Sequence, residues 1–179
     1  YPNGVDEKFF YQKRPPKNTP DWVDTITLGE DEFINLNSLP TLIWLGNLAA
    51  IEFHVPFSRF YDDDLTALVF DLDPSENQTF DDVVHCALNI NQTLAELGVT
   101  CYAKTSGATG LQLFIPTQKC SFIRGRKINE FFARYFVQKY PKLMTIERLK
   151  KNREGKLYFD YLQMAKGKNM ISVHSPRAV

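Results

Sequence analysis

The sequence predicts a domain of the α+β class, with three helices among several short β-strands. Three segments have apolar residues at the spacing of an amphipathic helix, whereas the remaining apolar runs are short and bounded by turn residues. The chain has 179 residues, of which 44% are hydrophobic, so it can bury one sizeable core. We therefore expect a single domain over residues 1–179.

Three strands are predicted in the first part of the chain, at residues 9–14, 22–27 and 33–36. The first of them carries Phe9, Phe10 and Lys13 between proline-rich turns. Exposed aromatic rings stack on bases and cations pair with phosphates, so this strand would suit contact with a nucleic acid. An edge strand whose aromatic residues serve the core is the alternative.

Helices are predicted at residues 40–53, 79–97 and 125–140. The first has apolar residues around most of its circumference, so we expect it to be buried. Thr79 is the expected N-cap of the second helix, and Gly98 is its expected C′ residue. His54 follows the first helix and is either a structural histidine or a side chain that reaches a triphosphate.

The chain is organised around a predicted strand at residues 68–73, in which apolar residues lead into Asp71 and Asp73. Side chains alternate between the two faces of a strand, so these two carboxylates point to the same face. They repel each other unless a cation lies between them, and Mg²⁺ prefers such oxygen ligands. A solvated strand end before a turn is the alternative.

A third carboxylate, Asp160, interrupts the apolar residues of a predicted strand at residues 156–163. A lone carboxylate in such a strand is costly unless it is paired or metal-bound. We therefore expect Asp160 to join Asp71 and Asp73 as a third metal ligand.

A turn of small residues, 105–110, separates two further predicted strands at residues 99–104 and 111–116. It contains Ser106 and two glycines, so its backbone N–H groups can approach phosphate oxygens closely. It lacks the lysine of a P-loop, and an ordinary hairpin turn is the alternative. Gln112 alternates with two leucines, so we expect it to face away from the core.

The net charge is zero, but the charges are unevenly distributed along the chain. Residues 1–99 carry 5 basic and 17 acidic side chains, and residues 100–179 carry 16 basic and 4 acidic ones. This asymmetry predicts a divided surface whose basic half meets polyanions, unless folding interleaves the charges. A strongly basic segment at residues 147–156 contains Arg148, Lys150, Lys151, Arg153 and Lys156. The alternative interpretation of this segment is a solvated helical face or loop.

Other features exclude membrane and secreted proteins. No apolar run is long enough to span a membrane, and residues 1–17 are too polar for a signal peptide. The three cysteines are scattered and lack metal-site spacing, which indicates free thiols in a reducing cytoplasm.

Nine short motifs follow one another along almost the whole chain. They are Tyr1-Pro2-x-Gly4-Val5-Asp6, Phe9-Phe10-x-Gln12-Lys13, Pro20-Asp21-Trp22-Val23, Glu52-x-His54, Val69-Phe70-Asp71-Leu72-Asp73-Pro74, Lys104-Thr105-Ser106-Gly107-x-x-Gly110, Thr145-x-Glu147-Arg148, Asp160-Tyr161-Leu162-Gln163 and Ser175-Pro176-Arg177-Ala178. In this order they resemble the polymerase domain of bacterial ATP-dependent DNA ligase D, a branch of the archaeo-eukaryotic primase superfamily.

The resemblance implies a primase-type core, with two β-sheet modules flanked by helices and the active site in the cleft between them. It implies a nucleotidyltransferase that adds nucleotides, with ribonucleotides preferred, to the 3′ end of DNA at double-strand breaks during non-homologous end joining. The implied partners are DNA ends with a primer-template and a 5′-phosphate, nucleoside triphosphates, a ligase domain and Ku. The implied location is the bacterial cytoplasm, associated with the nucleoid.

The resemblance also implies roles for individual residues. Asp71, Asp73 and Asp160 would be catalytic and would hold two divalent cations, Mn²⁺ or Mg²⁺. The residues around the incoming triphosphate would be His54, Ser106, Gln112, Arg153 and Arg177. Phe9 and Phe10 would stack near the template base, and Lys13 would contact DNA.

Two departures from the family pattern keep other functions open. The family usually has His at the position of Gln112, and its N-terminal helical segment and C-terminal extension are absent, so we expect a fragment of a larger domain. The first alternative that they leave open is a catalytically weak or dead module that binds DNA ends or a partner. A haloacid-dehalogenase phosphatase, whose first Asp is a nucleophile in a parallel sheet, is a further alternative, although Pro74 and Ser75 replace its usual Gly-Thr.

Overall fold

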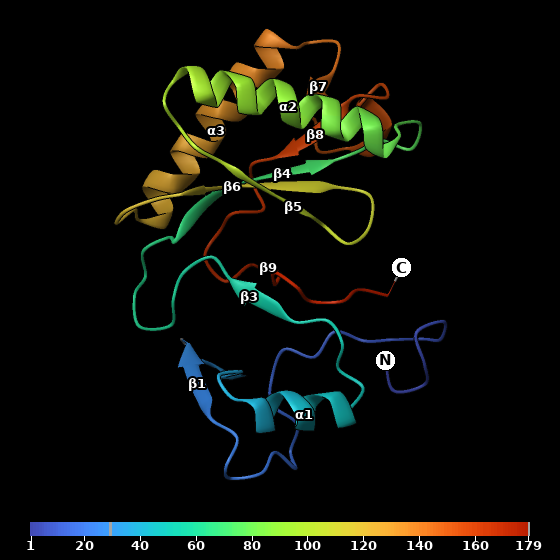
Figure 1. The fold of residues 1–179 in the computed structure, drawn as a ribbon, viewed down its shortest axis with the longest axis vertical. Coiled ribbons are helices and arrows are strands. Elements are labelled where there is room, and N and C mark those ends of the chain that lie inside the picture. The colour runs from blue at the N-terminus through green and yellow to red at the C-terminus, as the bar shows by residue number, and fades with distance from the viewer. Residues whose placement is uncertain (29, 179) are drawn as a thin grey trace. The chain divides into compact units, whose positions relative to one another are not determined.

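The computed structural model describes residues 1–28 and 30–178 and has an α+β fold, as predicted (Figure 1). Its helices are α1 (Leu39–Asn47), α2 (Phe80–Glu96), α3 (Phe122–Lys139) and the short 3-10 helix η1 (Lys150–Asn152). The chain divides into two compact units, which are described separately below. Unit 1 comprises Tyr1–Phe53 and His174–Ala178, and unit 2 comprises His54–Val173.

Unit 2 is built on a five-stranded sheet with the strand order β5-β6-β4-β8-β7. Its strands are β4 (Ala67–Asp73), β5 (Tyr102–Thr105), β6 (Leu111–Pro116), β7 (Met144–Thr145) and β8 (Leu157–Asp160). All neighbours are antiparallel except β7 and β8, which are parallel. The central strand β4 therefore lies between β6 and β8.

Helices α2 and α3 cover one face of this sheet (Figure 1). Phe70 of β4 is fully buried, and its ring packs against Phe132 and Phe136 of α3 and Phe159 of β8. Because side chains alternate along β4, the residues on either side of Phe70 point to the opposite face. The hydrophobic core thus fixes which face of the sheet carries Asp71.

The boundaries of α2 agree with the prediction because capping residues define them. The Thr79 side chain accepts a hydrogen bond from the Asp82 N–H, and the Asp82 carboxylate accepts one from the Thr79 N–H, which forms a capping box. Gly98 follows the helix with a φ of 71°, a conformation that favours glycine. Both signals were readable from the sequence.

Helix α3 packs against the sheet through only some of its aromatic residues. Phe136 and Asn129 are fully buried, whereas Phe131 is 64% exposed. Asn129 Nδ2 donates a hydrogen bond of 2.8 Å to the Val69 carbonyl oxygen of β4. The pairing of β8 with β4 begins only at Asp71, so β8 provides no hydrogen-bond donor for the Val69 carbonyl oxygen. The Asn129 side chain provides this donor instead.

Strand β8 ends at Asp160, three residues before the predicted end of the strand. The Asp160 side chain causes this, since its Oδ1 accepts a hydrogen bond of 2.9 Å from the Leu162 N–H. Such a bond to the backbone two residues later makes a turn.

Unit 2 also contains a two-stranded ribbon of β3 (His54–Pro56) and β9 (Asn169–Ile171). The two strands are antiparallel, and His54 lies opposite Ile171.

Unit 1 contains helix α1 and the hairpin of β1 (Thr25–Leu28) and β2 (Asp31–Ile34). Three sequence predictions are wrong here. Residues 9–14 form no strand, and α1 ends before Ala49, whose φ of 59° is incompatible with a continued helix. Helix α1 is also exposed instead of buried, with Leu39 67% exposed, because a two-stranded hairpin offers little apolar surface to cover it. Among the described residues, no helix combines the length and apolarity of a membrane span.

Candidate active site

Cross-strand pairing brings the candidate carboxylates onto one face of the central sheet. Asp71 lies directly opposite Asp160 on β8 and opposite Gln112 on β6. Directly opposed residues of antiparallel strands project to the same face, and Asp73 shares it because it lies two residues after Asp71. We call Asp71, Asp73 and Asp160 the acidic trio.

Burial and mutual repulsion disfavour the charged forms of two members of the acidic trio. Burial, with the nearby Asp73 carboxylate, raises the pKa of Asp71 to about 7, although a hydrogen bond from Gln112 opposes this rise. The pKa of Asp73 is also raised, first by burial and then by the Asp160 carboxylate. Arg153 and Lys150 act in the opposite direction on the pKa of Asp73, so both cations lie near it.

Arg153 is held in a fixed position beside the acidic trio. It is only 7% exposed, and it donates hydrogen bonds to the carbonyl oxygens of Glu147 (3.1 Å) and Arg148 (3.2 Å). Its guanidinium group lies 4.0 Å from the ring centre of Tyr158. The Tyr158 hydroxyl in turn donates to Asp160 Oδ1 at 3.1 Å. Arg153, Tyr158 and Asp160 thus form a connected set.

The turn that contains Ser106 packs against the end of β4. Ser106 Oγ accepts hydrogen bonds from the N–H groups of Gly110 (3.0 Å) and Ala108 (3.3 Å), which closes the turn. A Cβ atom at Gly110 would lie 2.7 Å from the Leu72 carbonyl oxygen and 3.3 Å from Asp73 Oδ1. Only glycine lets the turn approach Asp73 this closely.

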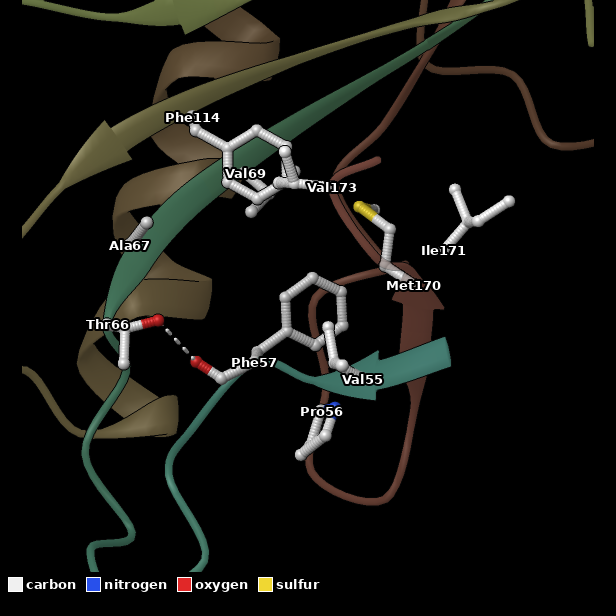
Figure 2. A pocket seen from close by; sticks show the side chains of 10 residues that line it. All are labelled: Val55, Pro56, Phe57, Thr66, Ala67, Val69, Phe114, Met170, Ile171 and Val173. Atoms are coloured by element: carbon white, nitrogen blue, oxygen red, sulfur yellow. Dashed lines mark hydrogen bonds between the residues drawn. The ribbon is translucent and has the colours of Figure 1, made fainter. Parts of the chain in front are cut away.

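An apolar pocket of about 100 Å³ lies between the central sheet and the β3–β9 ribbon (Figure 2). Val69 of β4 and Phe114 of β6 line it from the sheet, and Val55 and Met170 line it from the β3–β9 ribbon. Val69 lies two residues before Asp71, so the apolar lining of the pocket lies next to the acidic trio.

The other predicted site residues belong to strand β3 or to unit 1. His54 is half-buried on β3. Phe9, Phe10, Lys13 and Arg177 belong to unit 1.

The unit 1 site residues make their described contacts inside that unit. Lys13 pairs with Asp31 at 2.7 Å, and Arg177 pairs with Glu52 at 3.6 Å. Both phenylalanines are exposed, as base stacking requires, although the strand predicted for them does not form.

The donor set of the acidic trio fits a hard divalent cation. Three carboxylates on one sheet face repel one another, and the positive charge of a cation between them would offset both this repulsion and the effect of burial. Among residues 1–28 and 30–178, no three His, Cys, Asp or Glu side chains already stand in a metal-binding arrangement. The fit therefore rests on the chemistry and cross-strand placement of the three carboxylates.

Sequence reasoning missed Tyr158 and the bond between Gln112 and Asp71. Tyr158 lies two residues before Asp160, so strand alternation alone would have placed both side chains on one face. The pairing of Gln112 with Asp71 depends on the strand register, for which the sequence carried no signal.

The topology contradicts the phosphatase alternative. That class places its nucleophilic Asp in a parallel sheet, whereas both neighbours of β4 are antiparallel to it. Asp71 therefore does not lie in a phosphatase framework.

Comparisons with known proteins agree on one family. A family model described as "LigD, primase-polymerase domain" matches residues 1–179. The bifunctional non-homologous end joining protein LigD of Bacillus subtilis is 40% identical over 179 residues, covering 99% of this chain and 29% of the relative. The multifunctional non-homologous end joining protein LigD of Mycolicibacterium smegmatis is 32% identical, covering 99% of this chain and 24% of the relative.

A solved structure, the polymerase domain from Mycobacterium tuberculosis ligase D in complex with DNA, has a very similar fold. Its TM-score is 0.92 at 30% sequence identity, and the match covers 100% of this chain and 67% of the solved one. The chain thus spans less than a third of the length of the two LigD relatives and two thirds of this solved domain.

Proposed function

The chain belongs to the LigD primase-polymerase domain family, and from this membership we propose that it is a nucleotidyltransferase. It adds nucleotides, with ribonucleotides preferred, to the 3′ end of DNA at double-strand breaks during non-homologous end joining. Residues 1–179 act as a single catalytic domain. Its partners are DNA ends, nucleoside triphosphates, a ligase domain and Ku.

The observation that carries this proposal is the acidic trio on one face of the central sheet. Polymerases that use two metals need carboxylates that lie close together, because two cations held there stabilise the attacking and the leaving oxygens. Asp71 and Asp160 have this relation across neighbouring strands, and Asp73 lies two residues along the same face.

In the proposed reaction the primer 3′-oxygen attacks the α-phosphorus of a nucleoside triphosphate. A bond forms between these two atoms, the bond from the α-phosphorus to the bridging oxygen breaks, and pyrophosphate leaves with the electron pair. Mn²⁺ or Mg²⁺ held by Asp71, Asp73 and Asp160 would supply charge neutralisation and activation of the hydroxyl. The 3′-hydroxyl gives up its proton to solvent water during the attack.

The protein's own cations and donors bind the charged substrate. Arg153 meets the triphosphate with a guanidinium group that backbone carbonyls and Tyr158 already hold in place, so little conformational entropy is lost on binding. His54, Ser106 and Arg177 are the further triphosphate contacts. Gln112 stands at the position where the family usually has a His near the triphosphate. Phe9, Phe10 and Lys13 contact the template strand.

Primer extension tests the proposal. The protein is given a primer-template with a recessed 3′ end, each ribo- and deoxyribonucleoside triphosphate in turn, and Mn²⁺ or Mg²⁺. We expect metal-dependent extension that is faster with ribonucleotides, and Asp71→Ala should abolish it because the variant lacks a shared metal ligand.

The matched control is Glu76→Gln, which removes an exposed carboxylate three residues after Asp73 and should leave extension unchanged. Binding of DNA ends without extension by the unmodified protein would refute the polymerase function. It would establish the end-binding module in its place.

A further inference from the structure

We propose that Gln112 is a positioning residue that holds the Asp71 carboxylate ready for a divalent cation, instead of a direct ligand of the nucleotide. This role rests on the proposed nucleotidyl transfer and assigns Gln112 a specific part in it. It differs from the triphosphate contact that the resemblance alone implies for this position.

The strand register holds Gln112 in place. It lies on β6 directly opposite Asp71 of β4, and on its other side it lies opposite Lys104 of β5. Its side chain hydrogen-bonds to Asp71, and because the ionised carboxylate that binds a cation only accepts, the amide Nε2 is the donor in that form. Three paired strands therefore keep this donor aimed at one metal ligand.

The buried amide of Gln112 has a free-energy cost that an apolar side chain would avoid. Gln112 is 5% exposed, and among the described residues its Oε1 has no hydrogen-bond partner. A buried and unpaired carbonyl oxygen is unfavourable, whereas methionine has a similar size and no such group. The N–H donor is the part of the side chain that explains why glutamine stands here.

Asp71 needs such a donor because burial and two anionic neighbours outweigh the one cation near it, Lys104. Asp73 and Asp160 repel its negative charge, and burial deprives it of water. A neutral N–H donor orients the carboxylate without competing for the cation, as outer hydrogen-bond partners do for other metal ligands. The usual His of the family also has an N–H that can make this bond.

Direct measurement of Mn²⁺ binding without nucleotide tests this role, with free Mn²⁺ followed by electron paramagnetic resonance. Removing an outer partner typically weakens metal binding about 10–100-fold, so Gln112→Met should lower Mn²⁺ affinity by about tenfold or more. Gln112→His, which retains a donor, should stay within about threefold of the unmodified protein. Gln118→Met, at an exposed glutamine just after β6, is the control and should bind Mn²⁺ normally.

A second measurement separates positioning from direct contact. At saturating Mn²⁺ the nucleotide KM of Gln112→Met should equal that of the unmodified protein, since the residue acts through Asp71. Normal Mn²⁺ affinity in this variant, or a raised nucleotide KM at saturating Mn²⁺, would overturn the assignment. If the methionine variant proves unstable by thermal unfolding, Gln112→Asn replaces it, because its shorter amide no longer reaches Asp71 and should weaken Mn²⁺ binding equally.

The Mn²⁺ measurement is independent of polymerase activity. A protein that does not extend primers, yet loses Mn²⁺ affinity in Gln112→Met, would refute the proposed function and retain the role of Gln112. An unmodified protein that binds no Mn²⁺ would overturn the role itself.

Discussion

At the level of single residues, the chemistry of the site depends on how Asp71 is buried. Its carboxylate lies in a central strand between an amide on one side and a second carboxylate on the other. The acidic trio therefore destabilises the metal-free fold, as functional sites often do. This cost should be visible in the pH dependence of stability.

We predict that, without divalent cations, the free energy of unfolding falls as the pH rises from about 4 to about 7. In this range folded Asp71, with a pKa of about 7, still binds the proton that the unfolded chain, with a pKa near 3.8, has released. Raising the pH therefore removes stability, by an amount on the order of a few kcal/mol since one pKa unit is about 1.4 kcal/mol.

Urea unfolding at several pH values in the presence of a chelator measures this effect. Asp71→Asn should flatten the pH dependence and be more stable than the unmodified protein at pH 8, whereas the exposed-site variant Glu76→Gln should change neither. An Asp71→Asn profile parallel to the unmodified one would show that Asp71 is not the group responsible.

At the level of elements, the basic segment before β8 divides into two parts. Arg148, Lys150 and Lys151 are exposed around helix η1, whereas Arg153 is buried against Tyr158. The exposed part suits DNA phosphates, and the buried part suits a bound triphosphate. The sequence pattern alone did not distinguish these two roles.

We predict that replacing Arg148, Lys150 and Lys151 by Ala weakens DNA binding and reduces its dependence on salt. Each lost phosphate contact removes about 0.9 from the slope of log affinity against log salt concentration on duplex DNA. Fluorescence anisotropy over a range of salt concentrations measures the slope.

A variant with equal charge loss is the control for this experiment. Alanine replacements of Arg124, Arg126 and Lys127 remove three exposed cations from α3, a helix that contacts β4 and covers the helical face of the sheet. If both triple variants reduced the slope of log affinity against log salt concentration equally, binding would depend on net charge and not on the basic segment.

At the level of the whole molecule, nearly all of the buried core belongs to unit 2. Every member of the hydrophobic core cluster lies between residues 57 and 170. Unit 1 contributes Val23 as its one buried hydrophobic residue among those described. The two units therefore differ in how much burial stabilises them.

This difference predicts faster amide hydrogen exchange in unit 1 than in unit 2. Regions with few buried apolar contacts open more readily, so amides of α1 should exchange well before those of β4 and α2. Mass spectrometry of peptides from the intact protein provides the measurement. Equal protection of α1 and α2 would mean that contacts beyond the described core stabilise unit 1.

The sequence by itself determined the elements whose signals are local. Helix α2 was predictable because Thr79 and Gly98 mark its ends, and the shared face of Asp71 and Asp73 followed from strand alternation. Asp160 was identifiable because a carboxylate in an apolar strand needs a partner. The ordered motifs were sufficient to identify the family.

Only the tertiary structure decided how distant segments meet. The register of β6 and β8 against β4 places Gln112 and Asp160 on either side of Asp71, and register depends on the packing of the whole sheet. The exposure of α1 likewise depends on how little surface surrounds it. Apolar periodicity shows which face a helix offers, whereas burial requires another element to cover that face.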